Sequence, residues 1–509
     1  MKNLQIRLLI LATSIVLSAC GNAPTSGLIL ESGEATTQSD ATLDLETTPR
    51  PAYAPGTLVE YFAQTGDTVG ALAGRFNTSA AEIMAANPII PVNVTTLPAG
   101  LPMEIPIYYR AFWGSQYLII PDGHFPNGPY QRDFASQEFI ESHEGWLSNY
   151  SGTAAKEVLN AGAMVDLVAT NFSISPRVLL ALLEERAEGL SDPEAPDADA
   201  YVLGYDRVFY EGLYLQLVWA ANTLNNGYYG WRGGKLIEFD LLDGSIYRPD
   251  PWQNASSVAL QYFYAQILPA DEFKQAISSE GFAKVYEELY GDAWQQSADH
   301  IPGSLVQPEL RLPFVSGESW SLTGGPHTGW GEGEPWAAID FAPGANTSGC
   351  VQSQEWVTAV ADGLVVRTGE GTVVLDLDRD GDERTGWVIF YLHIEERARV
   401  REGGMVLAGQ PIGHPSCEGG SSTGTHQHIA RKYNGEWILA SGDMPFVMEG
   451  WEVVEGDVPY EGTLTKPGRQ VIACRCSDAN TRITSLAEPV NFPTPSTFDL
   501  ALPTATPSP

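Results

Sequence analysis

Positive charge is scarce in this chain. Its 509 residues include 28 Lys and Arg against 63 Asp and Glu, which gives a formal net charge of −35 at pH 7. A surface of this sign repels phosphate backbones and anionic headgroups, so the composition argues against nucleic acid as a partner. An acidic surface that only keeps the chain soluble explains the imbalance equally well.

Long apolar runs are also missing, and one short run lies near the N-terminus. Lys2 and Arg7 precede it and form a positive n-region. The run itself, residues 8–17, is too short to span a bilayer, so the segment predicts an export signal. The segment Leu-Ser-Ala-Cys-Gly at residues 17–21 resembles a bacterial lipobox. This resemblance implies cleavage before Cys20, lipidation of its thiol and an extracytoplasmic protein anchored to a bacterial membrane. The alternative is an ordinary secretory signal with a chance cysteine.

Histidine is rare but clustered. Only eight histidines occur, and five of them fall between residues 327 and 428. His426 and His428 stand two residues apart, and on a β-strand such residues project from the same face. Two imidazoles in one small volume suit a metal ligand beside a catalytic base, whereas unrelated surface or core histidines would be scattered.

Cysteine is scarce as well, with five residues in the chain. Cys350 and Cys417 lie in the same part of the chain as the histidine cluster, and an exported protein permits a disulfide between them. Cys474 and Cys476 are separated by one residue. A bond between cysteines this close is strained, so their partners stay open.

The length predicts several domains. One core cannot serve 509 residues, so we expect two to four domains and a multidomain α+β fold. A signal peptide at residues 1–19 would precede a polar tether at residues 20–55, which is rich in Thr, Ser and Glu and has little that could pack.

Residues 56–108 show the order strand, helix, helix, strand. Apolar residues at 58–62 predict the first strand, Thr68 and Ser79 are positioned to cap two short helices, and residues 103–107 predict the second strand. The segment resembles a LysM module through Gly66-Asp67-Thr68, Leu72-Ala73, Phe76-Asn77, Asn87-Pro88, Leu97-Pro98-Ala99-Gly100 and Ile105-Pro106. The resemblance implies binding to N-acetylglucosamine strands of peptidoglycan through Gly66, Asp67, Thr68, Asn87, Pro88 and Ile89. The alternative is a structural spacer.

Residues 109–150 lack periodicity and are interpreted as a linker, whereas residues 151–300 have apolar positions at helical spacing. They predict an all-α domain with helices near 154–172, 176–185, 213–224 and 258–267. Ser175-Pro176-Arg177-Val178-Leu179-Leu180-Ala181 loosely resembles the helix of lysozyme-like transglycosylases that carries a catalytic glutamate. Arg186 occupies the position of that acid, so we expect a non-catalytic helical domain, with a degenerate lysozyme-like fold as the sharper alternative.

Residues 305–445 predict an all-β domain. Alternating or apolar segments separated by Gly predict strands at 356–361, 363–367, 372–377, 386–393, 426–432 and 436–439. Residues 446–509 are interpreted as a C-terminal extension that becomes rich in Thr, Pro and Ser, and residues 486–509 are predicted to be disordered.

The β domain also carries motifs of a known family. Gly325-Pro326-His327, Ala338-Ile339-Asp340-Phe341, Tyr391-Leu392-His393 and the run from Cys417 to His428 resemble lysostaphin-type zinc endopeptidases, and most closely the β-lytic metalloproteases. In most of the wider family the first histidine ligand stands four residues before the aspartate, where this chain has Trp336. In the β-lytic subgroup it stands thirteen residues before, and His327 fills that position.

The resemblance implies a role for each matched residue. His327, Asp340 and His428 would bind one Zn²⁺, His426 would be the general base, and His393 would position the attacking water or stabilise the oxyanion. Zinc hydrolases use three protein ligands, and the metal makes hydroxide available near neutral pH. Gln427 departs from the usual leucine between the two histidines, but its side chain would point to the opposite face of the strand.

The function expected from these features is a lipid-anchored zinc endopeptidase that cuts peptide cross-links in peptidoglycan and is held on glycan by the LysM-like module. A non-enzymatic peptidoglycan-binding scaffold or hydrolase activator is the alternative, and a secreted protease acting on Gly-rich proteins is a third reading.

Asp376, Asp378 and Asp380 resemble the start of a calcium loop. Trp387 replaces the bidentate Glu of an EF-hand, so an acidic turn is favoured over a weak Ca²⁺ site.

Overall fold

The computed structural model describes residues 50–490 except residues 112, 198–199, 297–298, 345–347 and 477. Every described residue belongs to one compact unit of the chain. The predicted signal peptide, Cys20, nearly all of the tether and the tail at 491–509 lie outside the described residues. Within the described residues, no helix combines the length and hydrophobicity needed to cross a bilayer.

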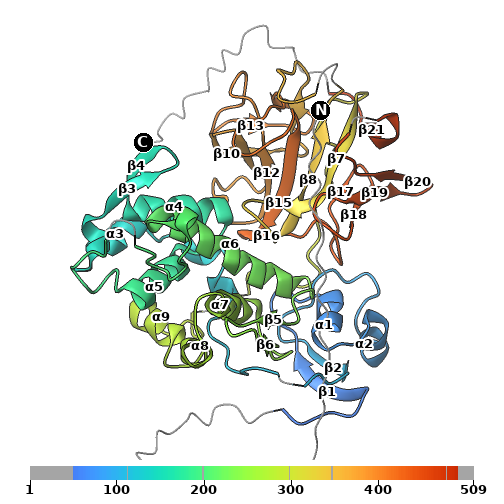
Figure 1. Ribbon diagram of the computed structural model, residues 1–509. Coiled ribbons are helices and arrows are strands. Elements are labelled where there is room, and N and C mark those ends of the chain that lie inside the picture. The colour runs from blue at the N-terminus through green and yellow to red at the C-terminus, as the bar shows by residue number, and fades with distance from the viewer. Residues whose placement is uncertain are drawn as a thin grey trace, which may run out of the picture. The chain divides into compact units, whose positions relative to one another are not determined.

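The N-terminal module has the strand–helix–helix–strand order predicted for it (Figure 1). It consists of β1 (Thr57–Phe62), α1 (Val69–Arg75), α2 (Ala80–Ala86) and β2 (Pro102–Ile107), with β1 and β2 antiparallel. The side chains of Thr68 and Ser79 accept hydrogen bonds from the amides of Ala71 and Glu82, so both helices begin at the predicted caps. A small apolar core that includes Leu72, Phe76 and Ile105 closes the module.

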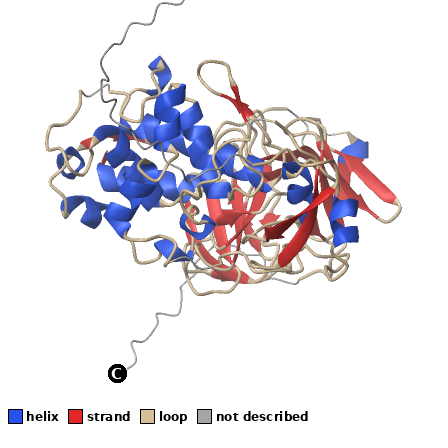
Figure 2. Ribbon diagram, turned by 90° about the horizontal axis from the view of Figure 1, so that it is seen from below, coloured by secondary structure: helices blue, strands red, loops and turns tan. Residues whose placement is uncertain are grey.

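The central segment is mainly helical, and Figure 2 shows its helices gathered apart from most of the strands. Its helices are α3 (Ser136–Glu141), α4 (Ala161–Phe172), α5 (Pro176–Ala187), α6 (Leu213–Arg232), α7 (Ala255–Ala265), α8 (Ala270–Ala276) and α9 (Phe282–Tyr290). Two short hairpins interrupt them: β3 (Ser151–Ala154) with β4 (Glu157–Asn160), and β5 (Phe239–Asp240) with β6 (Ile246–Tyr247). Helix α5 begins at Pro176 behind the Ser175 cap, as the sequence predicts.

Two boundaries of this segment differ from the prediction. The region expected to be a linker carries α3 and contributes Ile120, Phe125 and Trp146 to the same core as the helices, although its apolar residues follow no period. The helix expected from residue 154 begins instead at Ala161, because Ala155 and Lys156 adopt left-handed backbone angles that turn β3 into β4. Asn160 then caps α4, and this cap was the signal in the sequence that marked the true start.

The segment from residue 319 onward is almost entirely β-structure. Its large antiparallel sheet has the strand order β13-β10-β11-β12-β15-β8-β7-β21, and β16 also pairs with β15 (Figure 1). These strands are β7 (Ser319–Thr328), β8 (Trp336–Ala342), β10 (Gly363–Gly369), β11 (Thr372–Asp376), β12 (Trp387–Leu392), β13 (Met405–Val406), β15 (Gln427–Tyr433), β16 (Glu436–Trp437) and β21 (Arg482–Thr484). A separate pair joins β9 (Val357–Thr358) to β14 (Pro411–Gly413). The sequence prediction contained neither β7 nor β8, which together carry two of the predicted zinc ligands.

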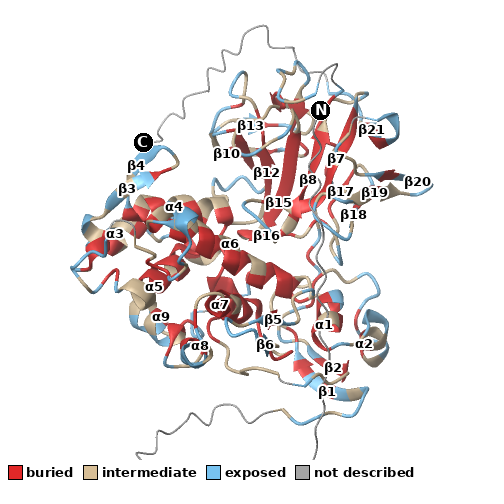
Figure 3. Cartoon of the chain, in the orientation of Figure 1, coloured by how far each residue is buried: buried red, intermediate tan, exposed pale blue. Residues whose placement is uncertain are grey.

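Both faces of the large sheet are covered. Figure 3 shows β8, β12 and β15 buried along most of their length. Ile429 packs with the core on one face, whereas Ala430 belongs to the core shared with the helical segment. The alternation along β15 therefore places His428 on the face of the sheet that is turned to the helical segment.

The C-terminal extension is part of this β domain, which corrects the predicted boundary at residue 445. A four-stranded sheet forms from β17 (Val447–Met448), β18 (Trp451–Glu455), β19 (Gly462–Lys466) and β20 (Arg469–Ile472). Trp451, Leu464 and Ile483 are buried in the core of the peptidase-like segment. These strands are short and their pairing is remote in sequence, so local patterning alone did not reveal them.

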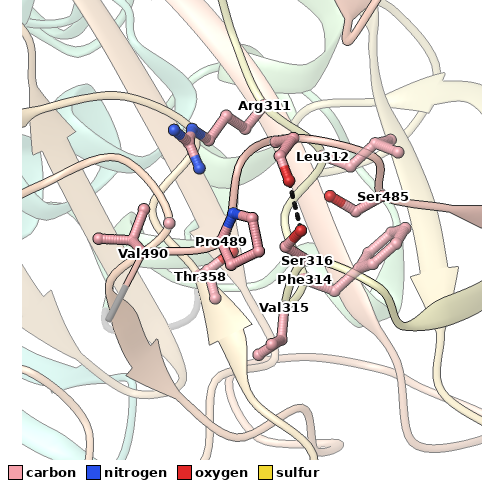
Figure 4. Close-up of a pocket in the computed structure, with 11 residues that line it drawn as sticks. Arg311, Leu312, Phe314, Val315, Ser316, Thr358, Ser485, Pro489 and Val490 are labelled. Atoms are coloured by element: carbon pink, nitrogen blue, oxygen red, sulfur yellow. Dashed lines mark hydrogen bonds between the residues drawn. The ribbon is translucent and has the colours of Figure 1, made fainter. Parts of the chain in front are cut away.

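The chain remains attached to the β domain up to residue 490. Ser316 Oγ donates a hydrogen bond to Ala487 O, and Arg311 Nη1 donates one to Glu488 O at 2.9 Å. Arg311, Ser316 and Val490 line a small cavity in this region (Figure 4). Its volume is about 60 Å³. Residues 486–490 are therefore ordered against the domain, which corrects the predicted start of the disordered tail.

A buried ionic cluster joins the three segments. Arg232 Nε, at the end of α6, donates to Glu436 Oε1 of β16 at 3.0 Å, and His300 Nε2 lies 2.6 Å from Glu436 Oε2. Arg232 also pairs with Asp122 at 3.2 Å and donates to the backbone oxygen of Thr65 in the N-terminal module. Because Arg232, Glu436 and His300 are all buried, loss of one partner would leave a charge unpaired away from water.

Candidate metal centre

Three neighbouring strands bring the predicted zinc ligands together. His327 lies on β7, Asp340 on β8 and His428 on β15, and His428 is the direct cross-strand partner of Asp340. His327 Nε2 is 3.0 Å from His428 Nδ1, and Asp340 Oδ1 is 3.3 Å from His327 Nε2 and 3.4 Å from His428 Nδ1. The register of β7 shifts around Gly324, where an added Cβ would approach Asp340 Oδ2 within 2.5 Å. Glycine at this position leaves room for the carboxylate.

This donor set fits a divalent metal ion. One ligand atom from each residue lies within 4.8 Å of the other two, and all three residues are buried. Among the described residues, no group donates a hydrogen bond to Asp340 Oδ1, and a buried carboxylate oxygen without a donor calls for a cation. Burial opposes ionisation of Asp340, but His327 and His426 outweigh it and hold the pKa of this carboxyl well below its usual range. Two imidazoles and one carboxylate are typical ligands of catalytic zinc.

Backbone carbonyls orient both histidine ligands. Gly325 O lies 2.9 Å from His327 Nδ1, and Gly329 O lies 3.2 Å from His428 Nε2. Each carbonyl can only accept, so it fixes the proton on the ring nitrogen that it contacts and leaves the other nitrogen unprotonated. His327 therefore presents Nε2 and His428 presents Nδ1 to Asp340, which is the arrangement that metal coordination requires.

The two predicted catalytic histidines lie beside the ligands. The rings of His393 and His426 are 4.4 Å apart, and His426 Nε2 is 3.7 Å from Asp340 Oδ1. Carbonyls orient these rings too: Glu418 O lies 2.7 Å from His393 Nδ1, and Gly424 O lies 2.8 Å from His426 Nδ1. Both Nε2 atoms are thus left free to accept a proton or a hydrogen bond.

Burial controls the charge of His393. Removal from water, together with the nearby rings of His426 and His428, lowers the pKa of His393 to about 3. His393 is therefore neutral at physiological pH. Its φ of 65° lies in the left-handed region, a costly conformation for a non-glycine residue that places the ring in the site.

Covalent and hydrogen bonds connect the loops around the two predicted catalytic histidines. Cys350 and Cys417 form a disulfide, which is the pairing expected from the sequence. Thr425 N donates to Gly349 O at 3.1 Å, and Val351 N donates to Thr425 Oγ1 at 2.8 Å. These contacts fix the backbone immediately before His426.

Gln427 is fully buried and pairs across the sheet with Phe341. It shares the face of β15 that carries Ile429, so it lies opposite the ligands, as expected from strand alternation. Neither its Oε1 nor its Nε2 has a hydrogen-bond partner among the described residues. The departure from leucine thus affects the packed face and leaves the ligand set intact.

Two of the residues proposed for glycan contact are used internally. Asp67 is 1% exposed, pairs with Arg75 at 2.7 Å and accepts a hydrogen bond from the Tyr61 hydroxyl. The side chain of Asn87 donates to Ile83 O and Glu104 O. Asp67 and Asn87 are therefore reassigned from ligand contact to the stability of the module, because their polar atoms are already satisfied.

The loop around Asp67 also packs against other parts of the chain. A Cβ on Gly66 would lie 2.7 Å from the guanidinium carbon of Arg232, and Gly66 and Thr68 line a cavity of about 160 Å³ with Lys235 and Glu455. Pro88 and Ile89 of the second loop are exposed instead, and Ile89 is 80% exposed. Any glycan surface of this module therefore centres on the second loop.

The acidic turn at residues 376–382 connects β11 to β12. Carboxylate oxygens of Asp376, Asp378 and Asp380 lie within 4.8 Å of one another. Asp376 accepts hydrogen bonds from the amides of Gly381, Arg379 and Asp378, and Asp378 accepts one from the amide of Asp380. These bonds are those of an acidic turn, the favoured interpretation, and the weak Ca²⁺ site stays a prediction.

Sequence reasoning missed one aromatic residue at the centre. Tyr460, in the connection from β18 to β19, stacks on His327 with ring centroids 4.1 Å apart and an interplanar angle of 19°. It lies in the extension that was placed outside the catalytic domain. No local pattern marked it, because its position depends on the pairing of the C-terminal sheet beside β7.

Comparison with known proteins agrees with this geometry. The protein-family model described as "Peptidase family M23" matches residues 335–439. The family model described as "LasA, N-terminal domain" matches residues 118–303. The beta-lytic metalloendopeptidase of Lysobacter enzymogenes is 30% identical over 173 residues, which are 31% of this chain and 90% of that protein. The chain belongs to peptidase family M23. The segment that matches this family is therefore a metalloendopeptidase domain.

Two further proteins are similar to different lengths of this chain. Protease LasA of Pseudomonas aeruginosa is 24% identical over 292 residues, which are 53% of this chain; the match spans 66% of LasA. Among solved structures, the M23 metalloprotease pseudoalterin from the deep sea is 23% identical and has a TM-score of 0.28. That alignment covers 33% of this chain and 96% of pseudoalterin. The match to the LasA N-terminal domain begins at residue 118, so it includes most of the region that was predicted to be a linker. The apolar core shared with the helices likewise places that region in the helical segment.

Proposed function

We propose that this protein is a zinc-dependent endopeptidase that hydrolyses a peptide bond in peptidoglycan cross-links. The observation that carries the proposal is the convergence of His327, Asp340 and His428 on one point, with His393 and His426 beside it. Membership of family M23 and the similarity to beta-lytic metalloendopeptidases support peptide-bond hydrolysis. A metal-free scaffold would not need a buried carboxylate oxygen that lacks a hydrogen-bond donor.

The residues of the centre divide the chemistry. Bound zinc supplies a Lewis acid that activates water and polarises the scissile carbonyl. His426 takes up the proton of the attacking water at its free Nε2, because Nδ1 is engaged by Gly424 O. His393, neutral and fixed by Glu418 O, offers Nε2 for orienting that water or the developing oxyanion.

A clearing assay tests the proposal. The purified full-length protein is added to a peptidoglycan suspension with zinc or with a chelator, and the released fragments are identified by mass spectrometry. We expect clearing and new peptide termini with zinc and neither with the chelator. Binding without clearing would favour the scaffold function, and cleavage confined to Gly-rich proteins would favour the secreted-protease reading.

His426→Ala separates the base from the metal ligands. We expect a loss of kcat of about 100-fold or more, the contribution typical of a positioned general base, with zinc retained at close to one ion per chain. The three ligand side chains are unchanged in this variant, so zinc content measured by mass spectrometry reports them independently of activity. Loss of zinc equal to that of a ligand variant would contradict the assignment of His426.

Attachment to the envelope completes the proposed function. A lipid on Cys20 would hold the protein at a membrane, and the LysM-like module would bind glycan strands and raise the local concentration of cross-links near the centre. The exposed apolar residues Ile89 and Val92, which are 80% and 97% exposed, support a binding surface on the second loop of this module. Retention on insoluble peptidoglycan that survives Ile89→Asp unchanged would argue against this surface.

A further inference from the structure

The C-terminal extension supplies one wall of the metal centre. Tyr460 lies against the ring of His327 and is locked to β7 by two backbone hydrogen bonds. Gly325 N donates to Tyr460 O at 2.8 Å, and Tyr460 N donates to Pro326 O at 3.0 Å. Tyr460 is therefore positioned by the same backbone segment that presents the predicted metal ligand, and the residue is only partly buried.

The hydroxyl of Tyr460 is a hydrogen-bond donor at the edge of the centre. A tyrosine hydroxyl is protonated at neutral pH and can donate a hydrogen bond to an anion or a carbonyl. A merely structural ring at this position would have no need of the hydroxyl.

Arg475 brings a positive charge to the outer side of the Tyr460 ring. Its guanidinium carbon lies 4.7 Å from the ring centroid, and the side chain is exposed. Cys474 and Cys476 are bonded to each other and bracket Arg475, and Cys474 N donates to Leu322 O of β7 at 3.2 Å. A short covalent ring attached to β7 thus holds the arginine over Tyr460.

In the described part of the chain, no carboxylate lies within ion-pair distance of Arg475, even though acidic residues outnumber basic ones by 63 to 28. A guanidinium packed by its face on an aromatic ring still presents its N–H groups along the edge, where they match the two oxygens of a carboxylate. The Tyr460 ring therefore contacts both His327, the predicted metal ligand, and Arg475. Arg475 has no acidic partner among the described residues.

We propose that Arg475 and Tyr460 form a subsite that binds a carboxylate of the substrate. The inference rests on the proposed endopeptidase function and adds a substrate preference to it. The protein cleaves peptides that carry a free carboxylate close to the scissile bond in preference to the same peptides bearing a carboxamide. Arg475 and the Tyr460 hydroxyl hold the carboxylate, while the ring of Tyr460 keeps this subsite at a fixed distance from His327.

The experiment compares two substrates that differ in one group. A synthetic cross-linked stem peptide, chosen as the one that the zinc-loaded protein cleaves, is made with a carboxylate or a carboxamide on the residue next to the scissile bond. We expect kcat/KM to be about tenfold higher for the carboxylate, the value of one charge-assisted hydrogen-bonded pair. Arg475→Gln should abolish this preference mainly through KM, and Arg475→Lys should keep part of it because the charge remains.

Arg469 offers a matched control. It also lies over an aromatic ring of the extension, Trp451, at 5.2 Å, but it is not part of the stack on His327. Arg469→Gln should keep the full preference, whereas Tyr460→Phe, which retains the ring and loses the hydroxyl, should reduce it. Equal cleavage of both substrates by the unmodified protein, or an unchanged preference in Arg475→Gln, would overturn the subsite alone. Failure of the zinc-loaded protein to cleave any cross-linked stem peptide would overturn the proposed function and the subsite with it.

Discussion

The His327→Ala protein is expected to contain no zinc and to have no measurable endopeptidase activity. Even the loss of an outer partner of a metal ligand costs about 10- to 100-fold in metal affinity, so loss of a ligand should cost more than about 100-fold. The remaining Asp340 and His428 would leave the metal with two protein ligands in place of three. Zinc content by mass spectrometry and cleavage of the peptidoglycan substrate check the two effects separately.

His414 provides the matched control for this substitution. It is another buried histidine of the same β domain, but its Nδ1 contacts Glu355 O at 2.7 Å and its ring packs on Trp356. His414→Ala should therefore keep its zinc, even if the loss of packing lowers its stability. Full zinc occupancy in His327→Ala would show that the ligand assignment is wrong, however inactive the variant proved.

Glu436→Ala is expected to have the largest effect on stability. Glu436 is 5% exposed and accepts hydrogen bonds from Arg232, Tyr228 and His300. Its removal leaves the Arg232 charge buried with Asp122 as its one ion-pair partner among the described residues, and breaking a buried pair in this way costs about 3–5 kcal/mol. Denaturant unfolding followed by tryptophan fluorescence measures the loss.

The more exposed pair Lys235–Glu455 is a matched control, since it joins the segment just after α6 to the β domain. Its side chains are 42% and 34% exposed, so Glu455→Ala should cost less than about 1 kcal/mol. Similar losses in the two variants would contradict the role given to the buried cluster.

The contribution of Glu436 also depends on pH. Burial raises its pKa, but Arg232 and His300 outweigh burial and bring the pKa to about 2, below the ordinary value of 4.5. A folded-state pKa below the unfolded one adds stability that is complete above the unfolded value and is lost as the pH falls toward the folded value. The stability difference between the unmodified protein and Glu436→Ala should therefore shrink between pH 5 and about pH 2.

The sequence revealed the centre better than its surroundings. His327, Asp340, His393, His426 and His428 stood in motifs whose spacing carried the chemistry, and the structure brings all five side chains together. The strands after residue 356 showed alternation that local patterning can detect. Strands β7 and β8 escaped prediction, because β7 contains Gly324 and Gly325 and its register shifts three times against β8.

The remaining misses share a physical cause, which is dependence on distant partners. Strand β21 pairs Ile483 with Trp320, so its burial is decided far away in the sequence. Glu436 appears in the sequence as an ordinary acid on a strand, and only the approach of Arg232 and His300 gives it a role. Tyr460 likewise gains its position from β7. Local periodicity contains no information about such encounters.

The four imidazoles of the centre are all held by main-chain oxygens, those of Gly325, Gly329, Glu418 and Gly424. Main-chain atoms are the same whatever side chain a residue bears. Neighbouring positions can therefore diverge during evolution without disturbing the protonation pattern of the reactive rings, provided that the strands keep their course. Substrate specificity can therefore change through substitutions in the surrounding loops while the four histidine rings keep their orientation. The same property suits directed evolution in which the loops are varied and the four histidines are kept.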